Sequence, residues 1–203
     1  MSQTSITLLN RLQTQNDPTT WDRLVSLYRP LLLMWLNKYD VQDSDAEDLV
    51  QDVLMTVSKD LATFDHNGRP GAFRAWLRSI LVNRLRNFWR ARGRRPQAKG
   101  DSDIERRLSQ LDDPASEMSL LWNKQHDVHV AQQLLALAEP NFTAETWTAF
   151  TRVAIDGERA DTVAAELGIS LNAVFIAKSR VLSRLRQEAA GIVDPDTDFP
   201  AKS

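Results

Sequence analysis

Helical periodicity is the feature that most constrains how this 203-residue chain can fold. Apolar residues recur three or four positions apart along most of the sequence. The alternation of apolar and polar residues that marks a half-buried strand is nearly absent. A chain of this kind buries its apolar stripes by packing helices against helices. The sequence therefore predicts an all-α fold.

The ends of the predicted helices come from cap and turn residues. Ser44 and Glu47 have the spacing of a capping box, and Thr143 can cap a helix that begins at Ala144. The segment 65–71 is a loop by its Asn, Gly and Pro content. The predicted helices cover residues 17–39, 44–61, 72–92, 116–140, 144–155, 160–167 and 171–188.

Composition divides the chain into two small helical domains joined by a flexible linker. Residues 96–115 contain Gly, Pro, Ser and Asp with few large apolar side chains, and at most a short helix is expected over 104–111. The predicted domains are therefore 1–95 and 116–191. The Pro- and Asp-rich tail, 192–203, is predicted to be disordered.

Positive charge is concentrated in one segment, although the formal net charge of the chain is −2. Ten Lys or Arg residues and no Asp or Glu lie between Arg69 and Lys99. Like charges repel, so folding alone gains nothing from gathering them, whereas a polyanion would. Trp76 is assigned to the core, whereas Trp89 is either a core residue or a stacking surface for bases. Asn83 is either an ordinary surface residue or a base reader. The segment predicts a nucleic-acid-binding helix.

Residues 162–174 have the pattern of a helix-turn-helix. Gly168 can end the first helix in the left-handed conformation, and Ser170 can cap the second. The alternative is a three-helix bundle that contacts no DNA. The basic residues that follow, and that suit phosphate contacts, are Lys178, Arg180, Arg184 and Arg186.

The remaining polar patterns do not indicate an enzyme. No Gly-rich phosphate loop, Ser/His/Asp arrangement or cysteine is present, so we expect no catalytic site and no cofactor. His126 and His129 lack a third ligand, so we expect no metal site and place both on the surface. No apolar run approaches the ~20 residues of a membrane span, and no secretory signal is evident. We expect a cytoplasmic protein without membrane insertion.

Asp45, Asp48 and Asp52 fall on one helix face, either as a solvated ridge or as a docking surface for a basic partner.

In this segment and in two others, the chain resembles the extracytoplasmic-function (ECF) sigma factors, group IV of the sigma-70 family. Residues 45–53 are similar to region 2.2, residues 73–83 to regions 2.3 and 2.4, and the helix-turn-helix to region 4. The run 83–90 and the acidic tail look most like a planctomycete-type branch.

The resemblance implies an RNA polymerase sigma factor, which directs promoter-specific initiation and aids promoter opening. The implied partners are promoter DNA and core RNA polymerase, through its β′ clamp helices and β subunit, with a possible anti-sigma factor. The implied docking residues are Asp45, Asp48, Leu49, Gln51, Asp52 and Val53. Those implied for the −10 element are Asp65, His66, Asn67, Arg69, Asn83, Arg84, Arg86, Asn87 and Arg90, with Asn83 as the base contact. Those implied for the −35 element are Ser170, Asn172, Phe175, Ile176, Lys178, Ser179, Arg180 and Arg184.

Two positions depart from the family pattern. The family usually has Lys or Arg just after the position of Val174 and again two residues later, where this chain has Phe175 and Ala177. Phe175 either contacts a thymine methyl group or is buried against Trp147. Two other functions stay open from the sequence: a free-standing helix-turn-helix regulator and an adaptor that binds only protein.

Overall fold

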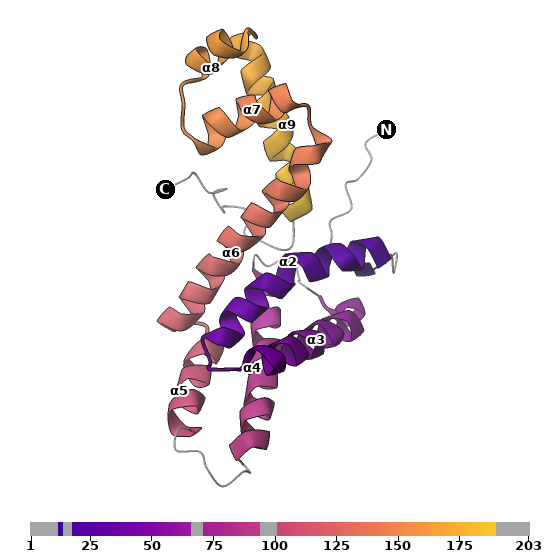
Figure 1. Ribbon diagram of the computed structural model, residues 1–203, viewed down its shortest axis with the longest axis vertical. Helices are drawn as coiled ribbons and strands as arrows, with labels where there is room; N and C mark the ends of the chain where they lie inside the picture. Colours follow the sequence, from indigo (N-terminus) through magenta and orange to yellow (C-terminus); the bar gives the residue numbers. More distant parts are fainter. Residues whose placement is uncertain (1–11, 14–17, 66–70, 94–100, 190–203) are drawn as a thin grey trace.

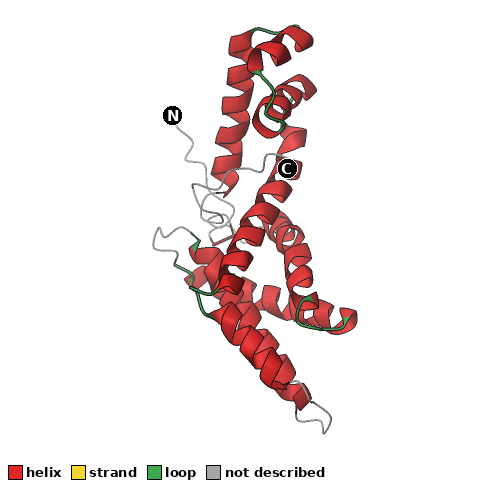
Figure 2. Cartoon of the chain, turned by 90° about the vertical axis from the view of Figure 1, so that its left-hand side faces the viewer, coloured by secondary structure: helices red, strands yellow, loops and turns green. Residues whose placement is uncertain are grey.

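The computed structural model describes residues 12–13, 18–65, 71–93 and 101–189. Every regular element within these ranges is helical, which confirms the predicted all-α fold (Figure 2). The tail 192–203 and the loop residues His66, Asn67 and Arg69 lie outside the described ranges.

Three helices form the N-terminal part of the core: α2 (Pro18–Asn37), α3 (Asp43–Asp60) and α4 (Ala72–Gly93), with a short 3-10 turn, η1 (Leu61–Thr63), after α3. Their apolar stripes meet, and Leu31, Trp35 and Phe73 are fully buried. The capping box predicted at Ser44 is wrong, because the Ala46 amide already donates to the carbonyl of Gln42 at 2.8 Å. The helix thus begins before Ser44.

The short helix expected over 104–111 is present but longer, and its packing contradicts a flexible linker over residues 101–112. Asp101–Asp112 form helix α5, which packs along α4 and buries Leu108 and Leu111 completely. Ile104, Leu108 and Leu111 lie four and three residues apart, so they form an apolar stripe in an otherwise polar segment. The stripe explains why this segment folds against α4.

The predicted boundary at residue 116 does not separate two cores. Helix α6 (Glu117–Ala138) packs on α2 and α4 with its first half and on α9 with its second (Figure 1). Trp122 is fully buried in the first contact, edge-on to Trp35 with ring centroids 5.1 Å apart. One hydrophobic cluster therefore runs from α2 to α9.

The C-terminal part begins with η2 (Glu139–Asn141) and α7 (Ala144–Phe150), which Thr143 caps as predicted by accepting from the Thr146 amide. A π-helical turn, η3 (Thr151–Ile155), follows, and then come α8 (Ala160–Leu167) and α9 (Leu171–Ala189). These helices enclose a second small core, made of Ala149, Val163, Ala164, Val174 and Ala177.

The described ranges contain neither a membrane-spanning helix nor a cluster of metal-ligating side chains. No single helix there is long and apolar enough to cross a bilayer; α8 and α9 pass that test only as a pair, bent by 107°. Three or more His, Cys, Asp or Glu side chains placed to hold a metal ion are likewise not found among these residues.

Candidate nucleic-acid interface

Much of the positive charge on α4 is paired with acidic groups from other helices. Arg86 donates from Nη1 to Asp112 Oδ2 at 2.8 Å and from Nε to Glu105 Oε1 at 3.2 Å. The hydrogen bond that Arg86 donates to Asp112 is the main reason why the pKa of Arg86 is raised. Arg92 pairs with Asp45 of α3. Folding therefore does gain from these arginines, contrary to the argument from the sequence.

Two more arginines lie against the core. Arg74 pairs with Asp127 of α6, and both side chains are largely buried, at 12% and 14% exposed. Arg78 is only 5% exposed, and burial lowers the pKa of its guanidinium. These two residues hold α4 to the rest of the fold and are poorly placed to contact a nucleic acid.

A stripe of polar side chains remains on the outer face of α4. Asn83, Asn87 and Arg90 are exposed and lie four and three residues apart, so they share one face. Arg84 is half-buried beside them and donates to Thr56 Oγ1 at 2.6 Å. The fold thus brings together four of the residues implied for the −10 element. Arg86 lies at the edge of this outer stripe and is held by α5, whereas Asp65 lies after η1 at the end of its described segment.

The aromatic residues of α4 serve packing. Trp76 stacks on Phe64 with ring centroids 4.6 Å apart, as expected for a core residue. Trp89 is half-buried, edge-on to Phe88 at 5.1 Å, and its buried Nε1 has no hydrogen-bond partner among the described residues. Of the two alternatives for Trp89, the structure therefore favours the core residue over the stacking surface.

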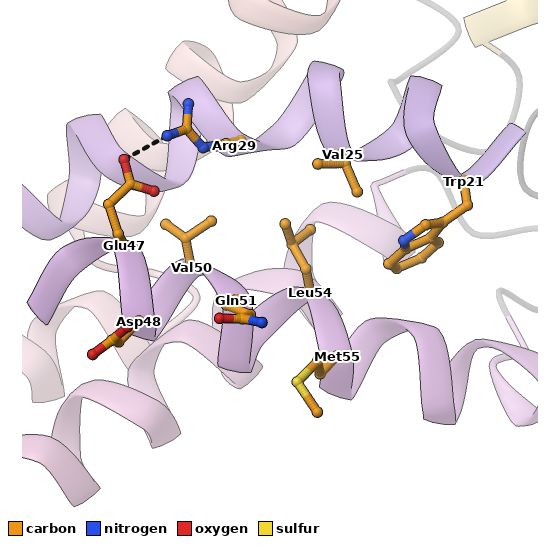
Figure 3. Close-up of a pocket in the computed structure, with 9 residues that line it drawn as sticks. All are labelled: Trp21, Val25, Arg29, Glu47, Asp48, Val50, Gln51, Leu54 and Met55. Carbon is orange, nitrogen blue, oxygen red and sulfur yellow. Dashed lines mark hydrogen bonds and ion pairs between the residues drawn. The ribbon is translucent and has the colours of Figure 1, made fainter. Parts of the chain in front are cut away.

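Helix α3 lies beside α2 and forms an open pocket of about 400 Å3 with it (Figure 3). Asp48, Gln51 and Met55 line its outer side, and Arg29 pairs with Glu47 at 2.5 Å across its end. Met55 is 61% exposed, so its apolar side chain is accessible at the edge of this pocket. The pocket and its polar rim suit contact with another macromolecule.

The residues implied for docking divide between this surface and the core. Asp48, Gln51 and Asp52 are exposed. Leu49 and Val53 are buried, at 6% and 0% exposed, so they support the surface from below and cannot themselves form it. Asp45 is half-buried and already paired with Arg92. Met55 was missed, although its place one turn after Gln51 on the polar face could have indicated it.

The pair α8 and α9 has the geometry of a helix-turn-helix. Gly168 ends α8 in the left-handed conformation with φ +67°, and the Ile169 amide donates to the Ala164 carbonyl at 3.0 Å. Ser170 Oγ accepts from the Ala173 amide at 3.1 Å. The bend of 107° between the helices lies within the range typical of this motif.

Among the residues implied for the −35 element, nearly all lie on the outside of α9. Phe175 is 52% exposed, so the alternative that it is buried against Trp147 is wrong; Trp147 packs instead on Phe142 and Phe150. Lys178 and Arg184 are half-buried, and Arg184 pairs with Glu188. The exposed members of the set are Ser170, Asn172, Phe175, Ile176, Ser179 and Arg180.

A buried polar network was missed by sequence reasoning. His126 was expected on the surface but is fully buried, with Nε2 3.2 Å from Tyr28 Oη and Nδ1 2.8 Å from Asp127 Oδ1. Burial lowers the pKa of His126, although Asp127 opposes this shift, and burial also raises the pKa of Tyr28. The burial of His126 could have been predicted from the sequence, because His126 lies four residues from both Trp122 and Val130, on the apolar stripe of α6.

His129, the other histidine of that pair, is half-buried and contacts the backbone of α2. Its Nε2 lies 2.7 Å from the Leu27 carbonyl oxygen. Each histidine is thus used in packing α6 against α2.

Comparison with known proteins finds similarity that centres on the three N-terminal helices. The family model for sigma-70 region 2 matches residues 24–95, the stretch that contains α3, α4 and most of α2. The ECF RNA polymerase sigma-E factor of Haemophilus influenzae is 30% identical over 118 residues, which cover 55% of this chain and 60% of that protein. Residues 24–95 are therefore similar to sigma-70 region 2, and a longer stretch of the chain is similar to an ECF sigma factor.

Proposed function

We propose that this chain is an ECF-type RNA polymerase sigma factor, a cytoplasmic initiation factor that directs core polymerase to specific promoters. The observation that carries the proposal is the outer stripe of α4, where Asn83, Asn87 and Arg90 stay exposed within the stretch similar to sigma-70 region 2. An amide and a guanidinium on an open helix face suit contact with bases and phosphates. Such a factor supplies recognition rather than catalysis.

At the −10 element, this stripe would hold the melted strand. Unstacking a base costs a few kcal/mol, and capture of that base by Asn83 would offset the cost. Arg84 and Arg90 would contact phosphates on either side. Arg86 contributes only if its pairing with Asp112 and Glu105 is released.

The surface around Asp48, Gln51, Asp52 and Met55 is the proposed docking site for core polymerase, at the β′ clamp helices. Its exposed carboxylates favour a basic partner, and Met55 with the open pocket offers apolar contact at the centre. An apolar centre with a polar rim is the usual composition of a protein interface.

Helix α9 is the proposed reader of the −35 element, with the first turns of the helix in the major groove. Two weak DNA contacts on one chain reinforce each other through effective concentration. If residues 96–115 thread toward the polymerase channel, α5 must first leave α4, because Leu108 and Leu111 are buried there. An anti-sigma factor that favours the closed arrangement would oppose this step.

Co-purification with core polymerase and run-off transcription test the proposal. Tagged protein should retain core enzyme, and core enzyme with this chain should start transcripts from a defined subset of a randomised promoter library. A chain that binds DNA but retains no core enzyme would be a free-standing regulator. A chain that retains other proteins but binds no DNA would be an adaptor.

A single variant tests the base contact. Asn83→Ala should reduce promoter opening by ~tenfold, the order expected for one specific base contact, and should relax the −10 preference. Asn37→Ala, an exposed asparagine near the end of α2, is the matched control and should open promoters normally. Core binding should be equal in both variants. Unchanged promoter choice in Asn83→Ala would remove this residue from the site.

A further inference from the structure

The first turns of α9 expose an apolar surface that the fold does not use. Leu171, Phe175 and Ile176 are 44%, 52% and 43% exposed, whereas Val174 and Ala177 beside them are buried in the small C-terminal core. Large apolar side chains on the surface of a small helical unit cost solubility without contributing to its stability. We therefore expect these three side chains to contact another molecule.

The order of residues around α9 indicates the shape of that partner. At 3.6 residues per turn, Asn172 and Ser179 fall on the outermost line of the helix. Phe175 lies to one side of this line and Ile176 to the other. The side chains thus form a narrow reading face about two turns long, with polar groups at its middle and an apolar group on each flank.

Charge on the same helix selects the chemistry of the partner. No Asp or Glu occurs from Leu171 to Gln187. Lys178 lies beyond Phe175, and Arg180 lies beyond Ile176, so the reading face is bordered by cations on both sides. A convex helix with positive edges is complementary to the two phosphate backbones that border the major groove.

In the major groove, the apolar group that a protein can contact is the C5-methyl of thymine. We propose that Phe175 and Ile176 select thymine at the DNA site of α9 through its C5-methyl group. The inference rests on the proposed function, because it assigns specificity to the helix that would read the −35 element. Asn172 and Ser179 supply hydrogen bonds between the two apolar contacts.

Replacement of thymine by deoxyuridine removes only the methyl group and leaves base pairing intact, so it tests the inference directly. Two random duplex pools, one made with thymine and one with deoxyuridine, are offered to the full chain with and without core polymerase. Sites enriched from the thymine pool should bind about fourfold less tightly for each contacted methyl removed, the worth of one buried CH2 group.

Variants on α9 locate the effect. Phe175→Ser and Ile176→Ser should bind thymine and deoxyuridine sites more nearly equally. Leu120→Ser on α6, at a residue 59% exposed, is the matched control and should keep the full preference for thymine. Because all three side chains are exposed, their thermal unfolding should stay close to that of the unchanged protein, and the deoxyuridine comparison needs no variant at all.

Each outcome decides the inference. Equal binding of both pools by the unchanged protein, together with promoter-specific transcription, would overturn the thymine contact and leave the proposed function standing. A loss of core binding in Phe175→Ser with an unaltered thymine preference would make this face a protein contact and would also overturn it. Failure to enrich any DNA, with or without core polymerase, would end both proposals.

Discussion

Helices α4 and α9 are both rich in arginine, yet their charges have different environments. In α4, Arg74, Arg86 and Arg92 each meet a carboxylate from α6, α5 or α3. In α9, the residues that border the outer face have no acid on the same helix before Glu188. The sequence of α4 looks the more strongly basic of the two, but the structure neutralises much of it.

The difference shows what a run of positive charge means in a folded chain. The acids that pair with α4 lie far away in the sequence, at Asp45, Glu105, Asp112 and Asp127. Electrostatic potential at the surface depends on these long-range partners rather than on local density. A basic segment therefore predicts nucleic-acid binding only through the residues that stay exposed.

Loss of the most buried pair should have the largest effect on stability. Asp127→Ala removes the carboxylate that pairs with the largely buried Arg74 and that contacts His126. The free energy of unfolding should fall by about 3 kcal/mol or more, as measured by urea denaturation. If Asp127→Ala lowered the free energy of unfolding no more than Asp103→Ala does, the buried pair of Arg74 would contribute no more to stability than the exposed pair of Arg106.

Asp103→Ala is the matched control for that experiment. Asp103 pairs with Arg106 on the exposed side of α5, and both side chains are more than half exposed. Exposed pairs of this kind contribute little, so the control should unfold close to the unchanged protein.

The contact between α6 and α2 should also make stability depend on pH. Burial lowers the pKa of His126 below its ordinary 6.5, although Asp127 raises it; Arg74 and His129 act with burial, and Tyr28 lies at the other ring nitrogen. The unfolded chain then binds the proton more readily than the folded one. Stability should be full above about pH 6.5 and should fall below it, by up to about 1.4 kcal/mol per pH unit.

Urea denaturation at a series of pH values measures this slope. His126→Asn should flatten the slope between about pH 5 and about pH 7, even if it lowers stability overall. An equal slope in the variant and the unchanged protein would assign the pH dependence to other groups.

The fold could be predicted to a large extent, because helical periodicity is a local property. The bounds of α2, α4, α8 and α9 agree with the predicted helices within about two residues. The linker prediction was wrong because α5 is polar overall and its burial depends on only a few apolar side chains. The average composition of the segment does not reveal a few apolar residues at helical spacing.

The candidate site was less predictable, because it depends on contacts between distant helices. The exposure of Asn83 and Arg90 on one face could be predicted from the sequence, since an outer stripe needs only helical spacing. Asp45, Leu49 and Val53 could not be separated from Asp48 and Gln51, because burial is decided by α2 and α4 rather than by α3 itself. The buried role of His126 likewise depends on Tyr28, which is 98 residues away.

Two arginines of α4 offer the finest test of the comparison. Arg86→Ala removes two ion pairs to α5 and should lower the free energy of unfolding by about 1 kcal/mol, since the carboxylates are partly exposed. Arg90→Ala should leave unfolding unchanged, because its side chain is exposed and its one hydrogen bond to a described residue is a long one, to Asn87 at 3.5 Å. In DNA binding the order should reverse: Arg90→Ala should reduce the slope of log K against log salt by about 1, whereas Arg86→Ala should alter it less. If both variants reduced this slope by the same amount relative to the unchanged protein, α5 would have to leave α4 when DNA binds, because only then is Arg86 as available to phosphates as Arg90.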